Sequence, residues 1–163
     1  MSKKPTKKND SEDVVRVICQ NRRAFHEYEI LDRLECGIAL VGTEVKSLRD
    51  GHANLEDAYA KVAGGELFLI NSEIPEYAMG NRMNHKPKRE RKLLVHRREI
   101  NKFAGEASQR VFTLVALRIY FKNGKAKVEI AIAKGKQLHD KRQTQKTAEA
   151  KREIQRAMSQ RRK

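Results

Sequence analysis

The sequence predicts a mainly β fold: a small, closed antiparallel barrel with two or three short helices and a basic C-terminal tail. Three observations lead to this expectation. One segment alternates apolar and charged side chains, two glycine-containing turns each join a pair of β-prone runs, and the regular β pattern stops at Ala133. At 163 residues the chain is long enough for one hydrophobic core but not for two.

The first strand is expected over residues 28–41. Its apolar side chains share one parity: Tyr28, Ile30, Leu34, Cys36, Ile38 and Leu40. Glu29, Arg33 and Glu35 take the other parity, which is typical of a strand that is buried on one face. Glu35 should therefore point away from the core, and Gly37 is a candidate β-bulge.

Two short helices are expected, over residues 42–51 and 96–104. In the first, Thr43 can cap the N-terminus and Gly51 can end the helix. In the second, which we expect to end at Gly105 and to plug one end of the barrel, one face is apolar. That face consists of Ile100, Phe103 and Ala104.

Two hairpins follow from turn chemistry. Residues 59–62 and 67–70 are β-prone and are joined across two glycines, which supply the positive φ of a tight turn. Residues 111–122 and 125–133 are joined by Asn123-Gly124, the strongest short hairpin signal. In the last strand the inward residues should be Val128, Ile130 and Ile132, and the outward ones Lys127 and Glu129. Antiparallel strands with one inserted helix suit a barrel of the oligonucleotide-binding kind, and an α+β sandwich is the alternative.

Residues 81–98 have no period, and Pro87 rules out a continuous helix there. We expect an exposed loop that leads into the second helix. Its basic residues are Arg82, Lys86, Lys88, Arg89, Arg91, Lys92, Arg97 and Arg98.

The excess of positive charge lies mostly at the two ends of the chain. Residues 1–23 hold 7 basic and 3 acidic side chains, residues 24–133 hold 18 and 15, and residues 134–163 hold 11 and 3. We therefore expect a flexible basic arm over 1–13, the barrel over 14–133 and a basic tail over 134–163. In the tail a narrow apolar stripe recurs at helical spacing, so the tail should be disordered alone and fold against a partner. The stripe consists of Ala150, Ile154, Ala157 and Met158.

The composition excludes several classes of protein. Cys19 and Cys36 have no ligand partners at metal-site spacing, no catalytic motif is present, and neither a metal nor a cofactor is expected. No apolar run suits a signal peptide or a membrane span, so we expect a cytoplasmic protein without a membrane partner. The net charge of +15 makes nucleic acid the first partner to test, and a merely soluble basic protein is the alternative.

Two places could carry RNA recognition. Asn21, Arg22, Arg23, Phe25 and His26 combine cations, an amide and rings that can meet phosphates and unpaired bases, although a solvated strand start with Phe25 in the core fits as well. An outward carboxylate such as Glu35 repels phosphate. It suits an RNA surface when it accepts from base amino groups or orients an arginine, and otherwise it is a surface residue with a lysine partner.

A set of short motifs recurs in order over residues 21–142. The motifs are Asn21-Arg22-Arg23-Ala24, Glu27-Tyr28, Gly42-Thr43-Glu44-Val45-Lys46-Ser47-Leu48-Arg49, Ala53-Asn54, Arg91-Lys92-Leu93-Leu94, Tyr120-Phe121-Lys122-Asn123-Gly124, Lys127-Val128, Ala133-Lys134-Gly135-Lys136 and His139-Asp140-Lys141-Arg142. Taken together, these motifs closely resemble the SsrA-binding protein (SmpB) family. Phe25 and Cys36 depart from the residues common in the family, and the aromatic residue often found in its tail is absent.

The resemblance implies an oligonucleotide-binding-like barrel that holds the tRNA-like domain of transfer-messenger RNA (tmRNA) and brings it to stalled ribosomes for trans-translation. The implied protein is an adaptor, not an enzyme, and one molecule should act with one RNA. A general ribosomal or RNA-chaperone protein is the alternative, and a nuclease is a third.

The resemblance also implies which residues contact each partner. The RNA-facing set is Asn21, His26, Glu35, Leu94, Lys127, Lys134, Gly135 and Lys136, to which the basic cluster adds Arg22 and Arg23. The tail should become helical in the messenger channel of the small subunit, with His139 near the decoding centre. The ribosome-binding residues expected in the tail are His139, Asp140, Lys141, Arg142, Lys151, Arg152, Ile154 and Met158.

Overall fold

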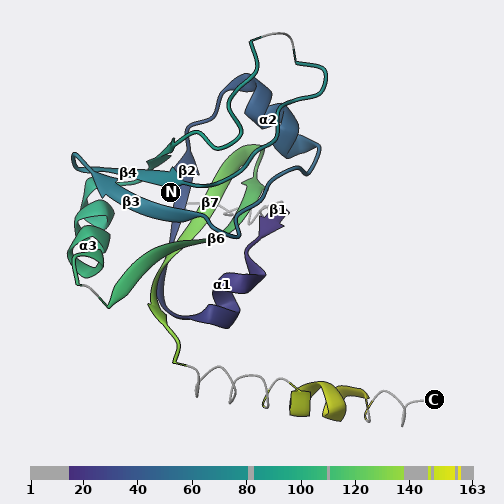
Figure 1. Ribbon diagram of the computed structural model, residues 1–163, viewed down its shortest axis with the longest axis vertical. Coiled ribbons are helices and arrows are strands. Elements are labelled where there is room, and N and C mark those ends of the chain that lie inside the picture. The colour runs from purple at the N-terminus through teal and green to yellow at the C-terminus, as the bar shows by residue number, and fades with distance from the viewer. Residues whose placement is uncertain are drawn as a thin grey trace, which may run out of the picture.

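The body of the protein consists of three helices and seven strands, whose arrangement is drawn in Figure 1. The computed structural model describes residues 15–80, 83–109, 111–137, 147, 149–156 and 158. In chain order the elements are β1 (Val15–Gln20), α1 (Arg22–Glu27), β2 (Tyr28–Ile38), α2 (Gly42–Arg49), β3 (Tyr59–Ala63), β4 (Glu66–Ile70), β5 (Arg91–Leu94), α3 (Arg97–Ala107), β6 (Phe112–Lys122) and β7 (Lys125–Gly135).

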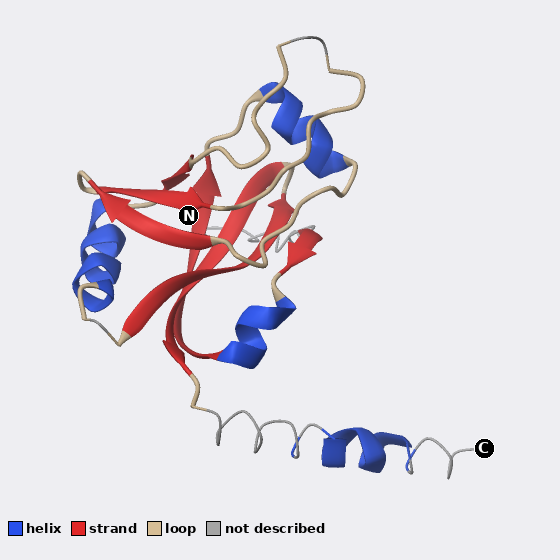
Figure 2. Cartoon of the chain, in the orientation of Figure 1, coloured by secondary structure: helices blue, strands red, loops and turns tan. Residues whose placement is uncertain are grey.

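The strands close into a barrel. Neighbouring strands are antiparallel and follow the order β1-β6-β3-β4-β5-β2-β7, and a further pairing of β6 with β7 completes the ring. Strand β1 pairs with β6 alone. The predicted closed antiparallel barrel is confirmed, and the strands wrap around a common centre with the helices outside (Figure 2).

Both predicted hairpins form with the turn geometry that their residues favour. Gly64 and Gly65 join β3 to β4 with φ of 58° and 76°. Asn123 and Gly124 join β6 to β7 with φ of 49° and 76°, and Lys122 pairs with Lys125 next to the turn. Two successive positive φ values match the right-handed twist of the flanking strands, so these turns fix the register of both hairpins.

Strand β2 contains its bulge before Gly37. The register with β7 shifts between Ile30 and Asp32, whereas Gly37 pairs regularly with Lys127 and with Leu94. The predicted bulge at Gly37 is therefore wrong. Gly37 instead allows a close approach of β2 to β5, because a Cβ there would stand 3.1 Å from the Cβ of Leu94.

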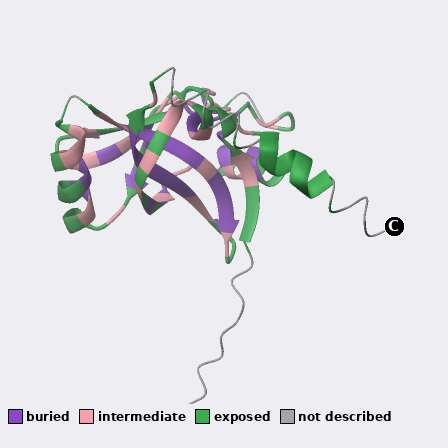
Figure 3. Cartoon of the chain, turned by 90° about the horizontal axis from the view of Figure 1, so that it is seen from below, coloured by how far each residue is buried: buried purple, intermediate pink, exposed green. Residues whose placement is uncertain are grey.

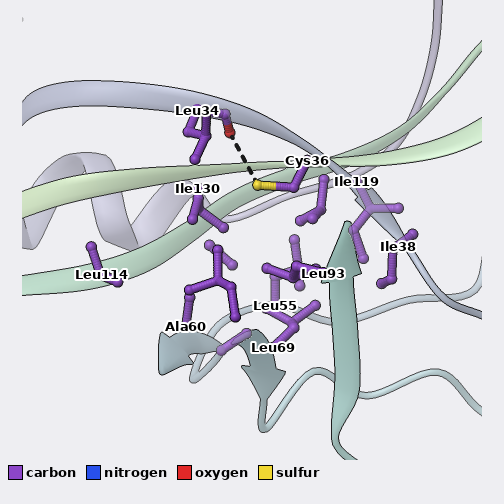
Figure 4. Close-up of a cluster of buried hydrophobic side chains, with 14 of the residues drawn as sticks. Leu34, Cys36, Ile38, Leu55, Ala60, Leu69, Leu93, Leu114, Ile119 and Ile130 are labelled. Carbon is purple, nitrogen blue, oxygen red and sulfur yellow. Dashed lines mark hydrogen bonds between the residues drawn. The ribbon is translucent and has the colours of Figure 1, made fainter. Parts of the chain in front are cut away.

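Because of the bulge, the apolar side chains in the two halves of β2 belong to different hydrophobic clusters. Tyr28 and Ile30 pack against Ala24 of α1 on the outer side of the sheet. Beyond the bulge the apolar side chains enter the barrel, where they join residues of the other strands (Figure 4). These inward residues are Leu34, Cys36 and Ile38.

The barrel interior is almost entirely aliphatic. Leu55, Leu67, Leu69, Ile74, Ile130 and Ile132 are fully buried. The Cys36 thiol is buried among them and donates to the carbonyl of Leu34 at 3.8 Å. Burial raises the pKa of this thiol to about 12, and Cys19 is also free with a raised pKa caused mainly by burial. Both thiols therefore stay protonated at neutral pH.

Helix α3 runs past its predicted end. Gly105 lies within the helix, whose last carbonyls are used by Ser108: its amide bonds to Ala104 O at 3.0 Å and its hydroxyl to Gly105 O at 2.6 Å. The prediction that Gly105 ends the helix is wrong, since this serine supplies the stop three residues later. Ile100 and Phe103 are buried in the core, as their spacing predicts.

The expected loop over 81–98 instead contains a strand. Residues Arg91–Leu94 form β5 between β4 and β2 and complete the ring. Arg91 is fully buried, and its guanidinium bonds to the Glu44 carboxylate, with 2.9 Å between Nη2 and Oε1. Arg89 Nη2 reaches the other oxygen of the same carboxylate at 2.6 Å. Two of the eight basic residues in this segment thus balance a buried acid, so the exposed-loop prediction is wrong there.

The C-terminal segment includes a helix. Residues 147, 149–156 and 158 are helical and all are exposed (Figure 3). Of the helices formed by the described residues, none combines the length and the apolar content needed to cross a membrane. The arm predicted over 1–13 lies outside the described residues.

Candidate nucleic-acid interface

The side of β2, β7 and β6 that points away from the core, here called the outer face, brings the predicted residues Glu35 and Lys127 together. In the register Glu35 lies opposite Glu129, and Lys127 lies opposite both Gly37 and Tyr120. Because side chains alternate along each strand, all these residues share the outer face, as periodicity predicted for Glu35 and Lys127.

Glu35 is held in place by a tyrosine and two lysines, which together with it form the Glu35 cluster (Glu35, Tyr120, Lys122, Lys127). The hydroxyl of Tyr120 donates to Glu35 Oε2. Lys127 Nζ lies 3.5 Å from Oε1, and Lys122 Nζ lies 3.8 Å from Oε2. The hydrogen bond from Tyr120, followed by the lysine charges, holds the pKa of Glu35 below its usual value despite partial burial. The side chain is 39% exposed, so an oriented, ionised carboxylate faces solvent.

Tyr120 is a candidate site residue that sequence reasoning missed. It is buried although it lies on the outer face, and the guanidinium of Arg118 lies 5.1 Å from the centre of its ring. Burial, with the hydrogen bond to Glu35, raises the pKa of Tyr120, so its hydroxyl stays protonated and can donate. The signal was present in the sequence, because the Asn123-Gly124 turn pairs Tyr120 with Lys127.

A second acid on the outer face is neutralised by arginines. Glu129 points outward as predicted, but its side chain is only 7% exposed. Arg118 Nε donates to Glu129 Oε2, and Arg33 Nη1 lies 3.4 Å from Oε1. The Arg33 guanidinium also lies 5.7 Å from the ring centre of Phe25 in α1. Two acids therefore stand on a face with four cations: Arg33, Arg118, Lys122 and Lys127.

Leu94 borders the Glu35 cluster. Gly37 of β2 lies between Leu94 of β5 and Lys127 of β7 and pairs with both. Leu94 and the lysine are therefore separated across the sheet only by a residue without a side chain. Leu94 is 55% exposed, which leaves an apolar side chain beside the charged groups.

Asn21 points into the protein. Its Oδ1 accepts from Ala24 N at 2.9 Å and so caps α1. Its Nδ2 donates to Leu55 O at 2.8 Å and to Ala116 O at 3.2 Å, and the residue is 3% exposed. The amide that was expected to face RNA is thus fully used in anchoring α1 to the barrel.

The other predicted residues gather at α1 and at the end of β7. Arg22 and His26 are exposed on α1, and Arg23 Nε donates to Glu27 Oε1 at 2.8 Å. Lys136 donates from its backbone to Glu27 O at 2.9 Å and from Nζ to Phe25 O at 3.2 Å. The exposed residues Lys134 and Gly135 precede it, so the tail leaves the barrel beside α1 (Figure 1). This group lies at the opposite end of the outer face from Leu94.

The tail residues are placed only in part. Lys151, Arg152, Ile154 and Met158 are exposed on the C-terminal helix. His139, Asp140, Lys141 and Arg142 lie outside the described residues. Within the described ranges, His, Cys, Asp and Glu side chains form no group that could hold a metal ion.

Comparison with known proteins identifies the family. The family model described as "SmpB protein" matches residues 18–160. The SsrA-binding protein of Geobacillus kaustophilus (strain HTA426) is 53% identical over 148 residues, 91% of this chain and 96% of the relative. That of Mycolicibacterium gilvum (strain PYR-GCK) is 52% identical over 161 residues, 99% of this chain and 96% of the relative. A solved structure described as "tmRNA-SmpB: a journey to the center of the bacterial ribosome" matches with a TM-score of 0.64 at 47% identity, covering 74% of this chain and 85% of that one. The chain therefore belongs to the SmpB protein family.

Proposed function

We propose that this chain binds the tRNA-like domain of tmRNA and delivers it to stalled ribosomes for trans-translation. The observation that carries the proposal is family membership over residues 18–160, with relatives named for binding SsrA RNA that match over nearly their whole length. The protein acts by binding and not by catalysis, and one protein molecule serves one RNA in the cytoplasm.

The outer face is the part of the barrel that recognises the folded RNA. Glu35 is ionised and fixed by Tyr120, which suits a carboxylate that accepts hydrogen bonds from the amino groups of bases. Lys127 and Lys122 beside it suit phosphates. At the other end of the face Arg22, Lys134 and Lys136 add cations that can follow the RNA backbone, and His26 adds an exposed imidazole ring.

The C-terminal segment serves the ribosome. Its described helix is exposed throughout, with Lys151 and Arg152 on a charged surface and Ile154 and Met158 as apolar positions four residues apart. Such a helix gains stability when its narrow apolar stripe packs against a partner. We place this helix in the messenger channel and the segment 139–142 near the decoding centre. The chain then has three parts: an arm over 1–13, the barrel over 14–133 and the tail over 134–163.

The division of labour is tested with three variants. Glu35→Gln and Lys127→Ala should each weaken binding to the isolated tRNA-like domain about tenfold, because each removes one directed contact worth roughly 1.4 kcal/mol. Deletion of 143–163 should leave that affinity unchanged and abolish tagging on stalled ribosomes. Lys61→Ala, the same change at an exposed lysine of β3, is the control.

The outcomes separate the proposal from its rivals. Equal loss of RNA affinity in the Lys127 and deletion variants would contradict the division of labour. Equal affinity for tmRNA and bulk tRNA at near-physiological salt would indicate a general RNA-binding protein, since non-specific charge contacts weaken steeply with salt. Cleavage of the RNA during incubation would indicate a nuclease.

A further inference from the structure

The chain leaves the barrel beside the C-terminal end of α1, where Lys136 attaches it to the helix. The backbone amide of Lys136 donates to the carbonyl of Glu27 at 2.9 Å, and its Nζ donates to the carbonyl of Phe25 at 3.2 Å. The neighbours Gly135 and Gln137 are exposed, whereas Lys136 is partly buried. Past the end of β7, the chain is thus still attached to the body of the protein at Lys136.

The two bonds of Lys136 complete the C-terminal end of α1. The last four carbonyls of a helix have no partners within the helix. In α1 the amide of Tyr28 bonds to the carbonyl of Ala24, and Lys136 bonds to those of Phe25 and Glu27. A lysine is favoured there because the C-terminal end of a helix carries partial negative charge. The helix end and the lysine therefore stabilise each other.

Helix α1 is itself fixed to the barrel. Asn21 caps the helix and donates to the carbonyls of Leu55 at 2.8 Å and Ala116 at 3.2 Å. Ala24 is 3% exposed and packs against apolar residues of β6 and β7. Because α1 is held at both of these places, a segment that is bonded to α1 is also held relative to the outer face.

The residue before Lys136 would otherwise let the chain turn freely. Strand β7 ends at Gly135, which lies opposite Tyr28 in the register. Apart from its chain neighbours, no described atom lies within 4 Å of where a Cβ of Gly135 would stand. Glycine also has more backbone freedom than other residues. The chain could therefore leave the sheet in many directions, and the two bonds of Lys136 select one.

We propose that Lys136 is a positioning residue that sets the direction in which the tail leaves the barrel. The proposal rests on the proposed function and adds how barrel and tail reach their two partners together. While the outer face holds the tRNA-like domain, the segment 139–142 has to arrive at the decoding centre. A fixed direction of departure reduces the conformational entropy that is lost on arrival. Contact of Lys136 with the RNA backbone needs only its charge, whereas the positioning role needs its hydrogen bonds.

The test compares variants that separate the hydrogen bond from the charge. Lys136→Met keeps an unbranched side chain of similar length and removes both, whereas Lys136→Arg keeps the charge and the N–H donors. Lys134→Met removes the same charge two residues earlier, from an exposed side chain. Lys61→Met, at an exposed lysine of β3, is the control. Thermal melting establishes that each variant is folded, and Lys136→Gln replaces Lys136→Met if the latter is not.

The first measurement is the distance between two nitroxide labels in the free protein, by pulsed electron paramagnetic resonance. The labels are placed at Ala63 of β3 and at Gln137, which are both exposed, through unnatural amino acids that leave Cys19 and Cys36 unchanged. The wild-type, Lys136→Arg, Lys134→Met and Lys61→Met proteins should each give one narrow distance distribution. Lys136→Met should give a broader distribution, because the chain then turns at Gly135.

The second measurement compares RNA affinity with tagging on stalled ribosomes. Lys136→Met should weaken binding to the isolated tRNA-like domain no more than Lys134→Met does. Its tagging rate should nevertheless be about fivefold lower than that of Lys134→Met, the factor that corresponds to one hydrogen bond worth roughly 1 kcal/mol. Lys136→Arg should restore the rate, because its guanidinium can donate to the same carbonyl.

Two results would overturn the inference: an unchanged distance distribution in Lys136→Met, or equal tagging rates for Lys136→Met and Lys134→Met. Either result would mean that only the charge of Lys136 matters, and it would leave the proposed function standing. Failure of the wild-type protein to bind the tRNA-like domain better than bulk tRNA would instead refute the proposed function. A broadened distance distribution in Lys136→Met would even then show that this lysine directs the chain.

Discussion

Replacement of Glu44 by glutamine should destabilise the barrel strongly while changing no group on the outer face. The Glu44 side chain is fully buried, and its Oε1 accepts from Arg89 Nε at 2.7 Å and from Arg91 Nε at 2.9 Å. Its Oε2 accepts from Arg89 Nη2 at 2.6 Å and from the backbone amide of Val41 at 2.8 Å. Glutamine keeps the size of the side chain but removes the charge and turns one acceptor into a donor that faces cations.

The size of the stability loss depends on whether each arginine can reach water once the Glu44 charge is removed. Arg89 is about one-third exposed and can turn its guanidinium to water, whereas Arg91 is fully buried and cannot. Removal of one partner from a buried ion pair costs about 3–5 kcal/mol, because the remaining charge stays desolvated. For a chain of this size that loss lowers the melting temperature by about 6–20 °C.

The assay is urea unfolding followed by circular dichroism, with Glu66→Gln as the matched control. Glu66 pairs with Lys92 at 2.5 Å on the surface, with both side chains 46% exposed, so its loss should cost less than about 1 kcal/mol. Equal destabilisation by the two substitutions would refute the reasoning, since it would mean that burial adds nothing to the value of the Glu44 charge.

The ion pairs of Glu44 with Arg89 and Arg91 should make the stability of the protein depend on pH. Burial alone raises the pKa of Glu44, but the bonds from Arg89 and the Val41 amide and the charge of Arg91 outweigh it, and the pKa is lowered. A lowered pKa in the folded state means that the stabilisation is complete above about pH 4.3, the ordinary glutamate value, and is lost as pH falls through the folded-state pKa. The difference in stability between the wild-type protein and Glu44→Gln should therefore narrow in acid.

Two further predictions concern the outer face. Asn21→Ala should lower the free energy of unfolding by about 1–3 kcal/mol, because it removes a helix cap and leaves buried carbonyls without a donor; a loss of RNA affinity at unchanged stability would show a direct contact instead. Tyr120→Phe should weaken RNA binding roughly fivefold, because Glu35 loses the hydrogen bond that orients it. The pKa of Glu35 should also return toward its ordinary value, so that the carboxylate is protonated, and binding is lost, at a higher pH than in the wild-type protein. Tyr59→Phe, at a tyrosine 39% exposed, is the control, and an unchanged pH profile in Tyr120→Phe would count against a positioning role.

The parts of the fold that could be predicted are those specified by neighbouring residues. The Asn123-Gly124 and Gly64-Gly65 turns set two hairpins and their registers without reference to the rest of the chain. Successive side chains of a strand point to opposite faces, and the apolar ones face the core. This alternation was enough to predict that Glu35 and Lys127 lie on the outer face.

The parts that could not be predicted depend on contacts between distant residues. Arg91 lies in a basic, aperiodic segment, and its burial depends on Glu44 and Ser72, which lie elsewhere in the chain. The apolar residues of β2 keep one parity along the whole strand, so the sequence gives no sign of a bulge. The bulge after Ile30 nevertheless turns the two halves of the strand toward opposite faces of the sheet. Asn21 caps a helix of only six residues, which has too little periodicity to be predicted from the sequence.

The distribution of charge explains how a basic protein can recognise one RNA. Residues 24–133 hold 18 basic and 15 acidic side chains, so the barrel as a whole carries little excess charge, although cations outnumber the two acids on the outer face. Most of the excess lies in residues 1–23 and 134–163, which carry 18 basic and 6 acidic side chains. Charge contacts supply affinity without sequence information, whereas directed groups such as Glu35 discriminate through what they accept. Under the proposed function, the Glu35 cluster therefore supplies discrimination between RNAs, and the basic ends of the chain supply most of the charge-driven affinity.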